Sequence, residues 1–417
     1  MTVKPLRRVF AVVNGGTPTA ESENWDGEVA WATPIDLGRR NGSRIARTQR
    51  TLTAQGLRTG SSLVPAGSLI ISTRAPIGYV AETTIPMAFN QGCRGLVPGK
   101  QLDVRFFRYQ LLVSGSRLES LGQGSTFIEL STEALASFPL AVPPITEQRA
   151  IADFLDAETA RIDALVANYL ELVDRLVDQR GAITVGGVAG ESLSGPRKPS
   201  TLTWLKEVPA HWAEVRLTLL ARLGSGHTPS REHPEWWLDC SIPWITTGEV
   251  SQIRDDRIEY LRETREKISE LGIANSSAEL HPAGTVVLSR TASAGYSAIM
   301  ATPMATSQDY VTWTCSPRLR PQFLLLCLRA MRPDLLGRLA MGSTHQTIYV
   351  PDIQSIRIPL PPLEEQDQLV EWIWKRLRRN HAAIDAIRSQ VELLAERRQA
   401  LTAAAVTGQP TVPGVAA

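Results

Sequence analysis

The sequence is poor in cysteine and in long apolar runs. Its 417 residues include four scattered cysteines and no C-x-x-C pair, which favours reduced thiols over a disulfide framework. These are Cys93, Cys240, Cys315 and Cys327. No apolar run approaches the length of a membrane span, and the N-terminal segment lacks the apolar core of a signal peptide. These absences predict a cytoplasmic globular protein with no membrane association, and its length predicts two or more domains.

The sequence also lacks the motifs of common nucleic-acid enzymes. It contains no Walker A loop, no G-x-G-x-x-G opening a helix after a strand, and no H-E-x-x-H. His227, His233 and Cys240 lie close together, but their spacing fits no zinc pattern, so loop residues are expected. The segments GQGST (122–126) and MGST (341–344) could hold a phosphate, although small-residue turns are commoner. The chain is therefore predicted to be non-catalytic, with no metal site of its own.

Charge is nearly balanced over the whole chain but is distributed unevenly. The formal net charge is +2. Residues 1–140 hold 15 Lys and Arg against 10 Asp and Glu, a difference of +5. Residues 146–183 hold 4 against 8, a difference of −4. The basic first segment is a modest indication of a polyanionic partner.

One motif occurs twice in the sequence. PPITEQ begins at Pro143 and PPLEEQ begins at Pro361, 218 residues later, so that Pro-Pro-x-x-Glu-Gln recurs about half a chain apart. An ordered series of further matches lies at offsets between 211 and 218: GGTP with GHTP, Trp31 with Trp244, VPAGSLIISTRAPIGY with HPAGTVVLSRTASAGY, and NQ with SQ. An ordered series indicates an internal duplication.

Each half consists of a β-rich part followed by a long helix. Short β-type runs such as SLIIST and TVVLS are separated by turn residues and predict compact, mostly β domains over 1–145 and 201–362. Apolar residues then recur every seven positions over 146–183 and 363–405, which predicts a coiled coil. The predicted seam comprises Leu155, Ile162, Tyr169, Leu176, Ile183, Ile373, Leu377, Ile384, Ile387, Val391 and Leu394.

Asn380 also falls at a seam position. A buried amide there could fix the register of the helices, and a solvated interruption of the seam is equally compatible with the sequence.

The duplicated motif lies where each β-rich part meets its helix. A residue that precedes proline is pushed out of the helical region, so each Pro-Pro pair enforces an extended entry. The following glutamates lie in the first helical turn, where the helix dipole favours negative charge. The motif is therefore interpreted as a rigid elbow. Residues 184–200 are predicted to be a flexible linker between the halves, and 406–417 a C-terminal tail.

Taken together, TP…W…PAG…STRAPIG…NQG…GST…PPxxEQ and the helix that begins RAIADFLDAETARIDALV resemble the specificity subunits of type I restriction–modification systems. The second half adds WLKEVPAHW, similar to the opening of that family's domains, whereas the first half lacks this opening. The second half also replaces STRAPIG with SRTASAG, so Arg290 and Thr291 stand where the first half has Thr73 and Arg74. Which arginine of that loop faces DNA is therefore open.

The resemblance implies an α+β protein with two target-recognition domains, each reading one half of a split, asymmetric DNA sequence. It implies that the two helices form an antiparallel coiled coil that spaces the domains and binds two modification subunits. Restriction subunits with helicase and nuclease activity would join the same assembly. This chain would need no cofactor, whereas S-adenosylmethionine, ATP and magnesium are expected in the partner subunits.

The hypothesised DNA-contacting residues lie in loops around these motifs, since Arg and Gln suit guanine and adenine edges respectively. They are Arg39, Arg40, Arg44, Arg47, Arg74, Gln91 and Arg94 in the first domain, and Thr246, Thr247, Arg254, Arg290, Gln308 and His345 in the second. The alternative prediction is a scaffold that bridges proteins without binding DNA, which the near-neutral second domain favours slightly. A self-sufficient restriction enzyme is disfavoured because the sequence carries no catalytic motif.

Overall fold

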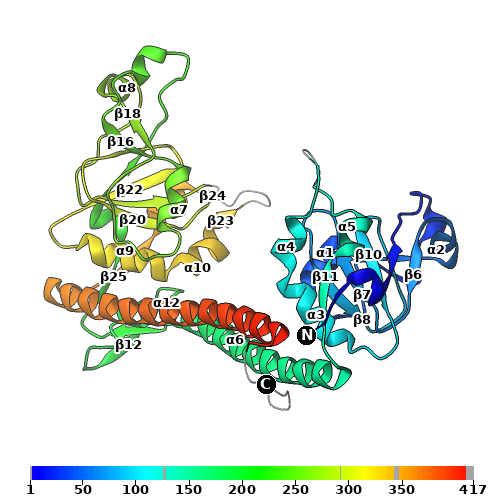
Figure 1. Ribbon diagram of the computed structural model, residues 1–417. Coiled ribbons are helices and arrows are strands. Elements are labelled where there is room, and N and C mark those ends of the chain that lie inside the picture. Colours follow the sequence, from blue (N-terminus) through cyan, green and yellow to red (C-terminus); the bar gives the residue numbers. More distant parts are fainter. Residues whose placement is uncertain (1, 125–127, 292, 342–346, 410–417) are drawn as a thin grey trace. The chain divides into compact units, whose positions relative to one another are not determined.

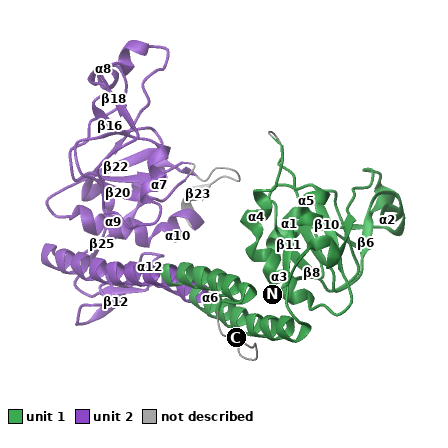
Figure 2. Cartoon of the chain, in the orientation of Figure 1, with its two compact units in different colours: residues 1–169, 389–417 green, residues 170–388 purple. Residues whose placement is uncertain are grey.

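A computed structural model describes residues 2–124, 128–291, 293–341 and 347–409 (Figure 1). The chain divides into two compact units (Figure 2). The first comprises residues 1–169 and 389–417, and the second comprises residues 170–388. Each unit holds one β-rich domain together with a part of both long helices.

The first β-rich domain is built on a five-stranded sheet in the order β2-β10-β7-β8-β4, with a four-stranded sheet in the order β5-β3-β9-β6 and a two-stranded sheet β1-β11. Its strands are β1 (Thr2–Pro5), β2 (Phe10–Asn14), β3 (Trp25–Ala32), β4 (Arg44–Ile45), β5 (Arg50–Leu52), β6 (Ser62–Val64), β7 (Leu69–Ser72), β8 (Val80–Thr83), β9 (Met87–Phe89), β10 (Cys93–Pro98) and β11 (Pro139–Val142). Its helices are α1 (Pro34–Arg39), α2 (Ala54–Gly60), α3 (Val104–Val113), α4 (Gly115–Glu119) and α5 (Thr132–Ser137).

The second β-rich domain repeats this topology. Its five-stranded sheet runs β15-β22-β19-β20-β17, beside a three-stranded sheet β18-β16-β21 and the pairs β14-β25, β12-β13 and β23-β24. Its strands are β12 (Arg197–Pro199), β13 (Glu207–Pro209), β14 (Ala213–Arg216), β15 (Ala221–Ser225), β16 (Ile242–Ile245), β17 (Tyr260–Leu261), β18 (Glu266–Ile268), β19 (Val286–Ser289), β20 (Ser297–Met300), β21 (Ala305–Thr306), β22 (Tyr310–Cys315), β23 (Ala340–Met341), β24 (Thr347–Ile348) and β25 (Arg357–Leu360). Its helices are α7 (Val250–Ile253), α8 (Glu270–Ala274), α9 (Pro321–Ala330), α10 (Arg332–Asp334) and α11 (Val350–Ser355).

The pairing directions match as well as the strand order. Four strands of each five-stranded sheet pair antiparallel, and the last strand, β4 or β17, joins in parallel. The duplication read from the sequence is therefore a duplication of fold.

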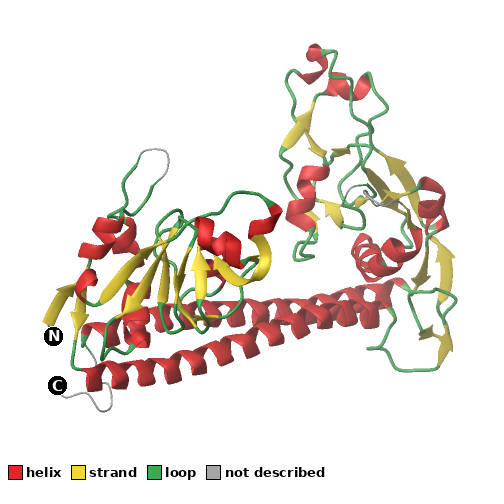
Figure 3. Cartoon of the chain, turned by 90° about the vertical axis from the view of Figure 1, so that its right-hand side faces the viewer, coloured by secondary structure: helices red, strands yellow, loops and turns green. Residues whose placement is uncertain are grey.

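Two long helices follow the domains, α6 (Ile145–Val188) and α12 (Leu363–Thr407) (Figures 1 and 3). In the first unit the start of α6 and the end of α12 share one core, since Leu155 is buried in the same cluster as Ala405 and Val406. In the second unit the end of α6 and the start of α12 share another core, which includes Val188 and Ile373. Within each unit the two helices are thus antiparallel neighbours, as predicted.

The prediction of a flexible linker over 184–200 was wrong. Helix α6 continues to Val188, which is fully buried, and Ala189 is buried beside it. Gly187 lies so close to α12 that a Cβ atom there would stand 2.2 Å from the Ile373 side chain. Arg197 of β12 then donates to the carbonyls of Ala189 and Gly190 at 3.0 and 3.1 Å. This segment is fixed because small residues let α6 approach α12 closely, a feature that its Gly-rich composition concealed.

Candidate nucleic-acid interface

The loop that follows β7 has the same framework as the loop that follows β19. Ser72 Oγ accepts from the N–H of Tyr79 at 2.9 Å, and Ser289 Oγ accepts from the N–H of Tyr296 at 3.0 Å. Each serine hydroxyl also donates to a carbonyl inside its own loop, at 2.7 and 2.5 Å. A glycine with φ of +92° precedes each tyrosine, a conformation that other residues rarely adopt. The sequences STRAPIG and SRTASAG therefore build one loop twice.

The main chain settles which residues correspond in these loops. The N–H of Thr73 donates to the carbonyl of Gly92 at 2.8 Å, and the N–H of Arg290 donates to that of Asp309, also at 2.8 Å. Arg290 thus takes the place of Thr73, and the partly exposed Thr291 takes that of Arg74. The exchange moves the guanidinium by one residue, so the two loops present different groups at equivalent positions.

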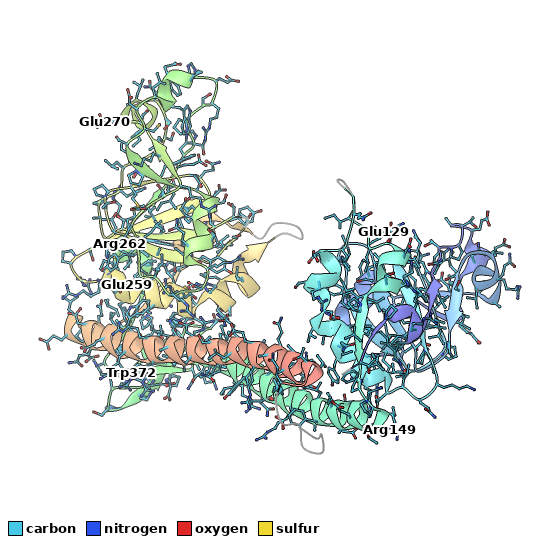
Figure 4. The ribbon with its side chains drawn as sticks, in the orientation of Figure 1. Glu129, Arg149, Glu259, Arg262, Glu270 and Trp372 are labelled. Carbon is cyan, nitrogen blue, oxygen red and sulfur yellow. The ribbon has the colours of Figure 1, made fainter. Side chains whose placement is uncertain are left out.

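Arg74 belongs to an ion-pair cluster in the first domain. Its Nε lies 3.0 Å from Glu129 Oε2, and its side chain is 49% exposed. Glu129, labelled in Figure 4, also lies 3.6 Å from the guanidinium of Arg94. The Arg94 side chain is only 11% exposed. Burial lowers the pKa of the Arg94 guanidinium, and the Glu129 carboxylate opposes this change. Arg74 is therefore an accessible cation, whereas Arg94 is largely part of the framework.

Asn90 and Ser307 each begin a tight turn whose second residue, Gln91 or Gln308, is exposed. In both turns the N–H of the fourth residue donates to the carbonyl of the first, at 3.1 and 3.2 Å. Asn90 Oδ1 and Ser307 Oγ accept from the N–H of the third residue, at 3.1 and 3.3 Å. The turns that carry the two glutamines are therefore built alike.

Each glutamine is held by a threonine and an arginine. Thr17 donates its hydroxyl to Gln91 Oε1, and Thr228 donates to Gln308 Oε1 at 2.7 Å. The main-chain carbonyl of Gln91 accepts from Arg94 Nη1 at 2.8 Å, and that of Gln308 accepts from Arg290 Nε at 3.0 Å. These threonines belong to GGTP and GHTP, so the structure explains why both tetrapeptides recur.

Helix α1 connects the remaining predicted arginines of the first domain to this loop. Pro34 at its start would lie 3.5 Å from a Cβ on Gly92, and Gly38 near its end packs on the ring of Tyr79. The cationic residues lie in its final turn and in the segment that follows. The four exposed arginines are Arg39, Arg40, Arg44 and Arg47. Arg44 Nε also lies 3.7 Å from Glu82 Oε2.

The second domain's predicted residues are more dispersed. Thr246 caps the 3-10 turn Thr247–Glu249, and the buried Glu249 accepts both its N–H and its hydroxyl, at 2.8 and 2.9 Å. Thr246 therefore has a structural task, as Thr33 does with Asp36 in the first domain. Thr247 and Arg254 are exposed. His345 lies outside the described residues.

Sequence reasoning missed a pair of arginine–tryptophan stacks. The guanidinium of Arg50 lies 3.5 Å from the ring centre of Trp25, and that of Arg231 lies 3.7 Å from the ring centre of Trp237. Each tryptophan also packs edge-on against the repeated tryptophan of its smaller sheet, Trp31 or Trp244, at 5.0 and 5.5 Å. Both arginines are exposed. A second tryptophan close to the repeated one in each half was the available signal.

Within the histidine and cysteine grouping, His233 makes structural contacts. His233 stacks on Trp236 with ring centroids 4.1 Å apart and contacts Glu235 at 3.0 Å. Across the described residues no group of three or more His, Cys, Asp or Glu side chains is placed to hold a metal ion.

The predicted seam residues face the inside of the helix pair to different degrees. Among them Leu155, Ile162, Ile373, Leu377 and Ile384 are buried, and Tyr169, Leu176, Ile183, Ile387, Val391 and Leu394 are half-buried. Asn380 is 5% exposed, and its Nδ2 donates to the carbonyl of Leu176 at 3.0 Å. It is thus a buried amide that joins the helices and not a solvated interruption. In the first unit Arg398 pairs with Asp163 at 3.1 Å.

Membrane-spanning character is not found in the described part of the chain: none of its helices combines the length and the apolarity that a bilayer crossing requires.

The fold and the site define a duplicated recognition protein, in which two β-rich domains present one loop framework with different side chains and each leads into a long helix. A family model described as the type I restriction modification DNA specificity domain matches residues 1–172 and 209–393. The chain belongs to this family.

Individual relatives agree with this family. The chain is 24% identical to the type I restriction enzyme MjaIX specificity subunit of Methanocaldococcus jannaschii, over 98% of this chain and 93% of that protein. It is 26% identical to the EcoR124I/EcoR124II specificity subunit of Escherichia coli, over 42% of this chain and 44% of that protein. Both relatives are named as specificity subunits, which agrees with the prediction of a non-catalytic chain.

Solved structures show the same fold. One matching chain has a TM-score of 0.74 at 17% identity, over 98% of both chains. Its structure is described as the structural basis of complex assembly and conformational transition of the type I R-M system. The HsdS subunit from Thermoanaerobacter tengcongensis has a TM-score of 0.59 at 16% identity, over 98% of this chain and 97% of that one. The predicted α+β fold with an internal repeat is confirmed, and the alternative of a scaffold that does not bind DNA is not favoured.

Proposed function

We propose that this chain is the sequence-specific DNA-recognition subunit of a type I restriction–modification complex. Each β-rich domain reads one half of a bipartite, asymmetric target in double-stranded DNA. The long helices set the distance between the half-sites and bind two modification subunits. Membership of the specificity family and the duplicated fold support this proposal.

The observation that carries the proposal is one framework with two sets of side chains. The first domain offers the exposed Arg74 beside Glu129, whereas the second offers Thr291, whose hydroxyl donates to Asp309 Oδ1 at 2.5 Å. Guanidinium, carboxylate and hydroxyl groups prefer different base edges. Domains that hold such different groups at equivalent positions should read different half-sites.

The helices have the length that a spacer requires. Helix α6 has 44 residues and α12 has 45. At about 1.5 Å per residue each would extend roughly 66 Å, and one turn of B-DNA advances roughly 34–36 Å. Helices of this length could therefore hold two readers roughly two turns of the duplex apart.

Partner subunits would bind along these helices. Leu165 and Leu172 of α6 and Leu393 of α12 are 39%, 42% and 55% exposed, which is apolar surface that a bound protein would cover. The modification subunits would supply S-adenosylmethionine for adenine methylation, and restriction subunits would supply ATP- and magnesium-dependent cleavage. This chain would contribute recognition alone and would act where those partners and the DNA are, in the cytoplasm.

The experiment is to express the chain with its modification subunits in a host that lacks them and to map methylated adenines across the genome. A split motif with two different half-sites and a fixed spacer is expected, and Arg74→Ala should relax one half-site only. Methylation that persists without this chain, or that follows no split motif, would overturn the proposal. A catalytically inactive modification subunit controls for background methylation.

A further inference from the structure

We propose that the two glutamine turns contact the sugar–phosphate backbone of DNA, and that base discrimination belongs to neighbouring side chains that differ between the domains. The inference rests on the proposed DNA-recognition function and reassigns Gln91 and Gln308, which the sequence placed at adenine edges. It commits to one ligand chemistry, a phosphodiester oxygen.

The first argument is that the two glutamine turns make the same contacts, although the arginine that contacts them comes from different positions in the two domains. A threonine hydroxyl holds each glutamine amide, and an arginine holds each glutamine carbonyl. That arginine is Arg94 of β10 in one domain and Arg290, which follows β19, in the other. Two different chain positions thus place a guanidinium on the main-chain carbonyl of the equivalent glutamine.

The close approach of the threonine segment is also repeated. A Cβ on Gly15 would lie 2.0 Å from the Asn90 carbonyl oxygen, and a Cβ on Gly226 would lie 2.0 Å from that of Thr306. No other residue type could let the two segments come so near without a shift of the backbone. The glycines therefore serve to bring each threonine to its glutamine.

The second argument is the chemistry that each turn offers to a ligand. The threonine hydroxyl donates to Oε1, so Nε2, which is a donor, is the amide group that the threonine leaves available to a ligand. A guanidinium contacts the main-chain carbonyl of the same glutamine. Donors next to a cation match an anionic acceptor, and Arg and Gln side chains commonly contact phosphate oxygens to fix the register of a protein on the duplex.

The third argument is logical. A contact that is the same in both domains cannot distinguish two different half-sites. The discriminating groups must be those that differ, namely Arg74 with Glu129 in the first domain and Thr291 with Asp309 in the second. The repeated turn is then the contact common to both half-sites, and the backbone is what every DNA sequence shares.

The test uses the full chain purified with its modification subunits, and binding to the mapped target and to every single base-pair substitution of the first half-site. Gln91→Ala should weaken binding by about 10-fold on every duplex, as expected for a lost hydrogen bond to a charged group. The ranking of the base pairs should not change. The slope of affinity against salt should also stay the same, because glutamine carries no charge. Gln308→Ala should behave in the same way over the second half-site.

Four further variants separate positioning from folding. Thr17→Val should reproduce the uniform loss, and Thr17→Ser should restore binding because the hydroxyl is retained. Glu129→Gln should instead alter the ranking of base pairs within the first half-site only. Gln55→Ala, at an exposed glutamine on α2, is the matched control and should bind as wild type does.

The outcomes are distinct. If Gln91→Ala changes preference at one base pair, the turn reads a base and the inference fails while the proposed function stands. Unchanged binding by Gln91→Ala also overturns it. If the wild-type assembly binds target and scrambled DNA equally, the proposed function itself fails.

Discussion

Gln366 donates its side-chain amide to the carbonyl of Pro361 at 2.9 Å, five residues earlier in the chain. Its Oε1 accepts from the N–H of Arg320 at 2.8 Å, at the start of α9. Gln148 repeats both contacts in the first domain, with Pro143 at 2.8 Å and Asp103 at 3.0 Å. One buried glutamine therefore ties the proline elbow and the long helix to the start of an earlier helix, α3 or α9, which is why Pro-Pro-x-x-Glu-Gln occurs twice.

Gln366→Ala should destabilise the second domain, because it leaves the buried Pro361 carbonyl and Arg320 N–H without their partner. Each buried group left unpaired costs roughly 1–3 kcal/mol. Urea unfolding followed by tryptophan fluorescence measures the loss. Gln399→Ala, at an exposed position of α12, should unfold at the wild-type midpoint. Equal midpoints for the two variants would show that the elbow contributes nothing to stability.

The sequence predicted the elbow's place but not its mechanism. The prolines and the acidic first turn could be interpreted from the sequence because their effects are local. The role of Gln366 depends on Arg320, which lies 46 positions away. The exchange between Thr73–Arg74 and Arg290–Thr291 was likewise visible as a substitution. Which residue of each pair bonds to the opposite main chain depended on Gly92 or Asp309, in the turn before β10 or β22, a long-range contact that no local pattern encodes. The Arg50–Trp25 stack was missed for the same reason, because β5 brings the two together across a sheet.

Asn380→Leu should stabilise the helix pair. The Asn380 side chain is buried, and within the described residues its Oδ1 has no hydrogen-bond partner. Replacing a partly satisfied buried amide with an apolar side chain of similar size favours the packed state and weakens the specification of register. The thermal midpoint should rise, and methylation should tolerate altered half-site spacing more readily than in wild type. A lower midpoint would mean that the bond to the Leu176 carbonyl outweighs the unpaired oxygen.

His381 should make the second unit less stable in mildly acidic solution. Burial lowers the pKa of His381 below its usual value of 6.5. The cations Arg180 and Arg257 lower it further, and Asp255 and Asp385 oppose them. The unfolded chain therefore binds a proton more readily than the folded chain does, so stability falls as pH drops below about 6.5 toward the folded-state pKa.

The measurement for His381 is the urea midpoint of the full chain between pH 5 and pH 8. His381→Gln should flatten the decline below pH 6.5, whatever its effect at pH 8. His227→Gln is the control, since His227 is exposed, and it should leave the decline unchanged. The buried His281, whose pKa burial also lowers, should account for the slope that remains. An unaltered slope in His381→Gln would assign the whole decline to other groups.

Lengthening both helices tests whether they set the spacing of the half-sites. The pair Asp163–Arg398 and the pair Leu176–Asn380 fix the local register within each unit. A heptad inserted after Tyr169 in α6, and another after Arg388 in α12, would fall between these pairs and leave both intact. Each helix would lengthen by roughly 10 Å, or about three base pairs of rise, while the seven-residue period keeps the apolar seam aligned.

The recognised spacer should then grow by about three base pairs with both half-sites unchanged. Four-residue insertions at the same points are the matched control, because they rotate the apolar seam and should destabilise the assembly. Genome-wide mapping of methylated adenines gives the spacer directly. If the heptad variant folds and still methylates at the original spacing, the helices do not set the distance between the half-sites. The partner subunits would then set the distance, because the linker that could have done so, residues 184–200, is partly helix and tied to the end of α6 by Arg197.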